Sequence, residues 1–161
     1  HIGTRRMLLS PSTTAPTEEW VARETEAFLQ VIQSMDEPAN ILIRDRDTKF
    51  GPMFDAVLED HRARAKVLPP RSPNLNAHVE RAIQTLRREC LDHFIILGCR
   101  HMNALTQEYA LHYNRERPHA SLDHRTPSGP TPERLARNDE PRVVCHTRLG
   151  GVVQHYCRKA A

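Results

Sequence analysis

A short apolar run, Ile41-Leu42-Ile43, ends abruptly in the four charged residues 44–47 (Arg-Asp-Arg-Asp). A run this short predicts a buried strand, because buried helices need at least about 10–12 residues. A second short run, ARAKVLP at 63–69, predicts another strand, which Pro69-Pro70 stops. The segment between them, GPMFDAVLED at 51–60, has the pattern of a short helix. Strands that alternate with helices favour an α/β fold.

Other segments fit this alternation. Residues 4–10 (TRRMLLS) predict an early strand, and a helix is expected from an N-cap at Thr17 to about Gln33. Further helices are expected at about 76–92 and 102–113. A proline-rich stretch follows, and the end of the chain predicts two short strands that turn at Gly150-Gly151.

The composition is that of a soluble globular protein, with 161 residues and a net charge of +3. Its basic residues gather in clusters that could neutralise DNA phosphates: Arg62, Arg64, Lys66 and Arg71; Arg81, Arg87 and Arg88; Arg115 and Arg117. No apolar run reaches the about 20 residues that span a membrane, and no signal peptide is evident. Four widely spaced cysteines without a CxxC pair favour reduced thiols and a cytoplasmic, nucleoid-associated location.

The helix expected at 76–92 carries one unusual acid. Helical spacing puts Val79, Ile83, Leu86 and Cys90 in an apolar stripe that is expected to face the core. Glu80 lies at the border of that stripe, in the first turn of a helix that is otherwise basic. A carboxylate there can meet another from the end of a neighbouring strand.

Asp45 is the expected partner of Glu80, because it follows the strand at 41–43 and ligand sites in α/β sheets gather at strand ends. Two such carboxylates near basic residues suit Mg²⁺, which takes carboxylate, water and phosphate oxygens. The simpler alternatives remain open: an aspartate after a strand is often a turn residue, and a first-turn glutamate often complements the helix dipole.

Three stretches together resemble the catalytic core of retroviral-type integrases and of DDE transposases from bacterial insertion sequences. They are ILIRDRDTKF (41–50), PPRSPNLNAHVERAIQTLRREC (69–90) and HYNRERPHASLDHRTP (112–127). The 34 residues between Asp45 and Glu80 are also close to the family's spacing. The resemblance implies an RNase H-like mixed sheet flanked by helices, with a partial integrase core at 1–130 and a tail with a small β-hairpin at 131–161.

The resemblance also implies roles for particular residues. Asp45 is similar to the family's second catalytic acid and Glu80 to the third, and both would bind Mg²⁺ or Mn²⁺ in a two-metal site. Asp47 competes with Asp45, which is preferred because its distance to Phe50 fits the family. The expected DNA-binding residues are Arg71, Asn76, Gln84, Arg87 and Arg88. The implied reaction is DNA strand cleavage and strand transfer by a homo-oligomer acting on element ends and target DNA.

The sequence departs from the family pattern near residue 1. The family's first catalytic aspartate is on an early strand, whereas here no acidic residue precedes Glu18. We therefore expect a core that lacks the first two strands, is poorly stable and is inactive alone. The alternative is a non-catalytic remnant that binds DNA or an intact transposase. A zinc site formed by Cys145, His146, His155 and Cys157 is a third possibility.

Overall fold

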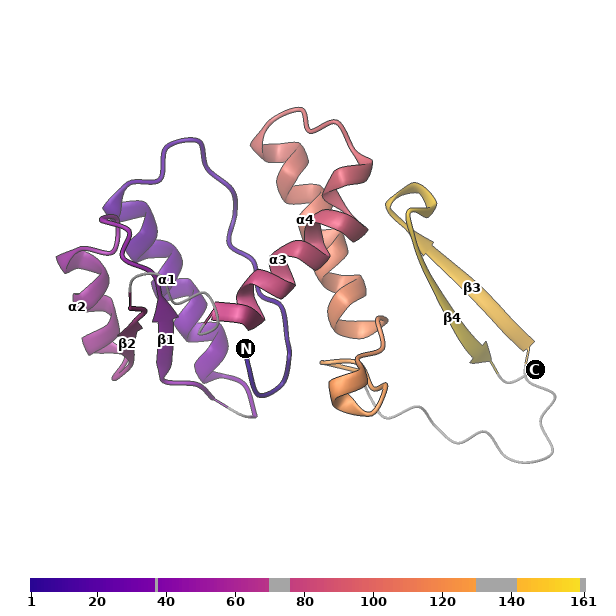
Figure 1. The fold of residues 1–161 in the computed structure, drawn as a ribbon, viewed down its shortest axis with the longest axis horizontal. Helices are drawn as coiled ribbons and strands as arrows, with labels where there is room; N and C mark the ends of the chain where they lie inside the picture. The colour runs from indigo at the N-terminus through magenta and orange to yellow at the C-terminus, as the bar shows by residue number, and fades with distance from the viewer. Residues whose placement is uncertain (37, 70–75, 130–141, 160–161) are drawn as a thin grey trace. The chain divides into compact units, whose positions relative to one another are not determined.

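The computed structural model describes residues 1–36, 38–69, 76–129 and 142–159 (Figure 1). Its contacts divide into two compact units, one of residues 1–3 and 10–82 and the other of residues 4–9 and 83–161. This division differs in position from the predicted domain boundary at residue 130, which stays a prediction. Within the described residues the α/β prediction holds in its coarse form, as helices with two small sheets.

The first unit consists of two helices, a two-stranded parallel sheet and the start of α3 (Ala77–Glu89). Helix α1 begins where predicted, because the Thr17 hydroxyl accepts a hydrogen bond from the Trp20 N–H at 3.2 Å. Strands β1 and β2 pair in register from Ile41 opposite Arg64 to Arg44 opposite Val67. The bounds are α1 Glu18–Gln33, β1 Ile41–Arg44, α2 Pro52–Asp60 and β2 Arg64–Val67.

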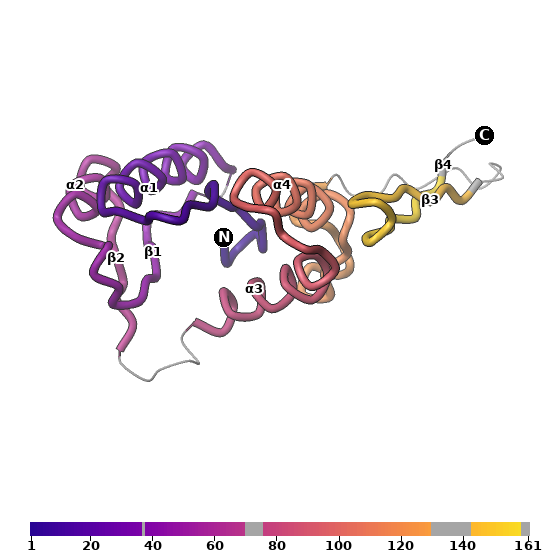
Figure 2. The backbone as a smooth tube through the Cα atoms, turned by 90° about the horizontal axis from the view of Figure 1, so that it is seen from above, coloured from indigo at the N-terminus to yellow at the C-terminus, as the bar shows by residue number. Residues whose placement is uncertain are grey.

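Helices α1 and α2 lie on one side of the β1–β2 sheet (Figure 2). The core there contains Leu29, Phe54, Leu58 and Ala63, with Leu42 and Ala65 of the sheet packed against it. Arg44 is on the same face and lies over the Phe50 and Phe54 rings, at 5.2 and 5.5 Å from their centroids. This face of the sheet is therefore a true core face.

The other face of the sheet is open, which corrects the prediction of a fully buried strand. Ile41 is 59% exposed and Ile43 37%, and their register neighbours are the charged residues Arg64 and Lys66. Parallel sheets normally bury both faces. In the described residues only one face of this sheet is covered, so the apolar side chains of Ile41 and Ile43 are less buried than their sequence pattern predicted.

The second unit is mainly helical and ends in a hairpin. Its elements are the later part of α3 (Ala77–Glu89), a short 3₁₀ turn at Leu91–His93, α4 (Cys99–Arg115), and strands β3 (Arg142–Arg148) and β4 (Val153–Lys159). The two strands pair antiparallel, and Gly150 and Gly151 adopt positive φ angles of 65° and 97° in the connection. The predicted hairpin is confirmed.

The strand predicted at 4–10 is wrong, and the reason is specific. Arg5 has a left-handed φ of 61°, which interrupts an extended conformation. The backbone of Met7 is paired with a side chain instead of a strand: its N–H donates to Asn114 Oδ1 and its carbonyl accepts from Asn114 Nδ2, both at 2.8 Å. An amide side chain thus supplies the two bonds that a neighbouring strand would have made.

Candidate functional site

Asp45 lies directly after β1 and is exposed. Its Oδ1 accepts a hydrogen bond from the Asp47 N–H at 3.1 Å, which closes a tight side-chain turn. Asp45 thus acts as a turn residue, which was the simpler of the two interpretations of its position after a strand. The same bond fixes the carboxylate at the carboxyl end of the strand, where a ligand could reach it.

Asp47, the competing candidate, is held by Lys49. Its Oδ1 accepts from the Lys49 N–H at 3.0 Å, and its Oδ2 pairs with Lys49 Nζ at 2.7 Å. The hydrogen bond from the Lys49 side chain is the main reason that the pKa of Asp47 is lowered. A metal ion would have to displace this ammonium group. The arrangement therefore supports Asp45 over Asp47 as a metal-binding carboxylate.

Glu80 is exposed in the first turn of α3, where a negative charge complements the helix dipole. Carboxylates such as Asp45 and Glu80 suit Mg²⁺ in kind. Yet in the part of the chain that the structure describes, no three acidic, histidine or cysteine side chains come together as a metal site. The described carboxylates are therefore of the kind that binds Mg²⁺, but the described residues do not bring three candidate ligands together.

The predicted apolar stripe of α3 is largely uncovered, which is a second correction. Val79 is 46% exposed and Ile83 53%, whereas Cys90, just after the helix, is fully buried. No residue of α3 is itself buried. The stripe exists in the sequence, but the described residues cover only its C-terminal end.

The polar residues predicted to bind DNA are accessible on α3. Gln84, Arg87 and Arg88 are all exposed. Within the described residues, Arg87 forms a long ion pair, 3.9 Å from its Nε to Asp92 Oδ1, with both side chains more than half exposed. Asn76 is half-buried just before the helix, and Arg71 lies outside the described residues. Two arginines in a last turn also complement the helix dipole, so their structural role and DNA binding are compatible.

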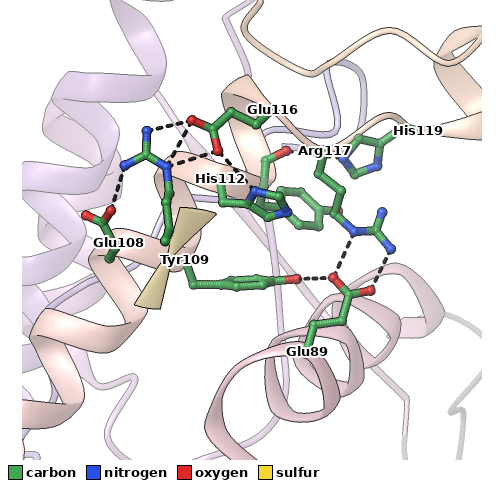
Figure 3. Close-up of polar contacts among 9 residues, drawn as sticks. Glu89, Glu108, Tyr109, His112, Glu116, Arg117 and His119 are labelled. Carbon is green, nitrogen blue, oxygen red and sulfur yellow. Dashed lines mark hydrogen bonds and ion pairs between the residues drawn. The ribbon is translucent and has the colours of Figure 1, made fainter. Parts of the chain in front are cut away.

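A carboxylate that sequence reasoning missed, Glu89, is the centre of a polar network at the end of α3 (Figure 3). It accepts hydrogen bonds from Tyr109 Oη at 2.7 Å and from Arg117 Nε and a terminal guanidinium nitrogen at 2.9 and 2.7 Å. Burial raises the pKa of Glu89, but the hydrogen bonds from Arg117 and Tyr109 outweigh it, so its pKa is lowered. The sequence offered no local signal, because the partners are 20 and 28 residues away.

A second network attaches the hairpin to α4. Arg148 of β3 donates to Glu116 at 2.6–3.0 Å and to Glu108 at 2.6 Å, and His112 Nδ1 lies 3.1 Å from Glu116 Oε2 (Figure 3). The hydrogen bond from Arg148 is the main cause that lowers the pKa of Glu116 to about 2. Through these contacts and those of Arg117, residues 113–119 (the YNRERPH stretch) are bonded to the hairpin and to the end of α3.

The four residues of the possible zinc site do not converge. Cys145 is opposite Tyr156 in the hairpin, whereas Cys157 is opposite Val144. Directly opposite residues of a sheet share a face and neighbours along a strand alternate, so the two cysteines point to opposite sides. The hairpin is held by its own ladder and by Arg148.

Residues 61–127 match the family model described as "Integrase core domain". This part of the chain is similar to the integrase core family. The matched residues contain Glu80, all of α3 and α4, and the YNRERPH stretch, and they fill less than half of the chain. Asp45 lies before them. Neither a curated protein nor a solved structure gives a significant match.

The integrase core match confirms the family resemblance, and that family implies DNA integration or transposition in general terms, with DNA as a partner. The family is generally dependent on divalent metal ions. None of the described helices is long and apolar enough to cross a membrane.

Proposed function

We propose that this chain binds DNA through the exposed polar side of α3 and contributes Asp45 and Glu80 to metal-dependent DNA strand cleavage and strand transfer. The observation that carries the proposal is the integrase core match across α3 and α4. The exposure of both carboxylates and of the α3 arginines supports it.

Phosphate binding is assigned to Arg87 and Arg88, with Gln84 on the same helix and Arg71 and Asn76 before it. Arginine donates several hydrogen bonds in a planar fork that suits phosphate oxygens. The long ion pair of Arg87 with an exposed aspartate is easily exchanged for a phosphate, because surface pairs contribute little. Contacts of this kind position DNA and read little of its sequence.

Asp45 and Glu80 are the residues proposed to hold Mg²⁺ or Mn²⁺. When bound, such ions activate an attacking oxygen and stabilise a leaving one in phosphodiester chemistry. Because the described residues contain no cluster of three candidate metal ligands, strand cleavage needs groups that these residues do not supply. We therefore expect the chain alone to bind DNA without cutting it.

The open face of the β1–β2 sheet supports a larger assembly. Ile41 and Ile43 are exposed there, and parallel sheets normally have both faces covered, so this face suits packing against another segment or another chain. Assembly into the expected homo-oligomer is also a source of a further metal ligand. The second candidate function, a non-catalytic DNA-binding protein, is favoured by the absence of a three-ligand cluster among the described residues.

Titration of the purified chain with Mn²⁺, followed by its melting temperature, tests the carboxylate assignment. A ligand that binds the folded state raises its stability. We expect a saturable rise that is lost in Asp45→Asn and in Glu80→Gln but kept in Glu59→Gln, a change at another exposed acid. A rise unchanged in both variants would remove these residues from the metal site. Addition of Mg²⁺ and labelled DNA completes the test, since cleavage lost in Glu80→Gln would contradict the expected inactivity.

A further inference from the structure

The β3–β4 hairpin is basic throughout. Residues 142–159 contain Arg142, Arg148, Arg158 and Lys159 and no aspartate or glutamate. Arg148 is occupied by its ion pairs with Glu108 and Glu116, so it holds the hairpin to α4. The other cations of the hairpin have no acidic neighbour in its sequence, which gives the hairpin a positive field that attracts a polyanion.

The register divides the hairpin into two faces. Arg148 is opposite Val153, which is only 7% exposed, and this face is the one attached to α4. On the other face Cys145 is opposite Tyr156, and Val143 is opposite Arg158. All four of these side chains are exposed, Tyr156 by 62% and Val143 by 61%. We call this second set, with Thr147 and Gln154, the outer face.

A cavity of about 330 Å³ adjoins the outer face, where β4 lies beside the end of α4. Gln154, His155 and Tyr156 line it from β4, and Glu116 and Arg117 from the other side. The Tyr156 hydroxyl donates to Gln154 Oε1 at 3.0 Å, which orients the amide and leaves its NH₂ group to donate. An aromatic ring and an amide of the outer face thus line the same cavity.

We propose that the outer face binds an unpaired segment of DNA, with a base stacked on Tyr156 and its edge toward Gln154, and with Arg158 on a flanking phosphate. The inference rests on the proposed DNA function and adds a second contact surface to it. Aromatic side chains that bear an exposed ring beside cations are the usual platform for single-stranded nucleic acid.

Charge argues against a second copy of the chain as the occupant. Two outer faces brought together would place the same basic hairpins against each other, and like charges across an interface are costly. The phosphate backbone of DNA has the complementary charge. Glu116 is the one acid among the described residues that line the cavity, and its ion pair with Arg148 offsets its repulsion of DNA.

Fluorescence anisotropy of a labelled single-stranded oligonucleotide, in EDTA at low salt, tests the inference with the full chain. We expect Tyr156→Ala to weaken binding roughly tenfold, the size of one lost stacking contact, and Tyr156→Phe to keep it. Arg158→Ala should weaken binding more than the charge-matched Arg100→Ala, and Gln107→Ala, at an exposed position of α4, should change nothing. Because these side chains are exposed, the variants should keep the circular dichroism of the parent.

Two results would overturn the inference. In the first, DNA binding is unchanged in Tyr156→Ala and in Arg158→Ala but is reduced in Arg87→Ala/Arg88→Ala. The hairpin proposal would then fail, and the proposal that α3 binds DNA would stand. In the second, sedimentation shows that the parent chain self-associates, and Tyr156→Ala abolishes this self-association without changing DNA binding. The outer face would then be the binding surface for a second copy of the chain. A parent chain that binds neither single-stranded nor duplex DNA would instead be the failure of the proposed function itself.

Discussion

Arg117 donates two hydrogen bonds to the carboxylate of Glu89, at 2.9 and 2.7 Å, and so joins the residues after α4 to the end of α3. The guanidinium also lies 5.7 Å from the centroid of the Tyr113 ring. The helix that carries Glu80 and the proposed phosphate-binding arginines is therefore fixed at its C-terminal end by a residue of the YNRERPH stretch.

Arg117→Lys should destabilise the second unit by about 1–2 kcal/mol, because an ammonium group cannot make the two parallel bonds of a guanidinium. The loss is moderated by solvent, since the two side chains are 30% and 36% exposed. Urea unfolding measures it. Arg115→Lys, at an exposed position of α4, is the matched control and should leave the midpoint unchanged.

Asn114→Ala should release residues 4–9 from the second unit, because it removes both hydrogen bonds to the Met7 backbone. Amide hydrogen exchange should rise at Met7, with a loss of about 1–2 kcal/mol in unfolding free energy. Asn114→Asp keeps the acceptor for the Met7 N–H but loses the donor, so we expect an intermediate effect. Equal protection of Met7 in parent and Asn114→Ala would contradict the assigned role.

Stability should fall in acid through Glu116. Its pKa is lowered from an ordinary 4.5 to about 2 by Arg148, so the folded state favours the ionised form. The contribution is fully present above about pH 4.5 and is lost as the pH falls toward 2. The difference in melting temperature between the parent and Glu116→Gln should shrink over this range. A difference that grows on acidification would have the wrong sign.

Elements whose signals are local could be predicted from the sequence. The N-cap at Thr17 and the paired glycines 150 and 151 each fix a boundary by their own chemistry. The strand at 4–10 could not be recognised as wrong, because its backbone bonds come from Asn114, which is 107 residues away. The exposure of Ile41 could not be predicted either. An apolar run shows that a strand can be buried, but it does not show whether another segment covers the strand.

The candidate site divides in the same way. The positions of Asp45 after a strand and Glu80 at a helix start followed from the sequence pattern and agree with the structure. The ion pair of Lys49 with Asp47 and the three hydrogen bonds to Glu89 depend on side-chain geometry. The spacing of residues along the sequence does not reveal that geometry. Whether Asp45 and Glu80 share a metal ion stays a prediction.

The salt dependence of duplex DNA binding tests the central claim most directly. Each phosphate contact contributes about 0.9 to the slope of log affinity against log salt concentration. We predict that Arg87→Ala/Arg88→Ala lowers this slope by about 2, while the equally charged Arg23→Ala/Arg100→Ala leaves it near that of the parent. The control is well matched, since the Arg23 side chain is 69% exposed and that of Arg87 67%. Equal slopes in the two double variants would mean that α3 is not the DNA-binding surface.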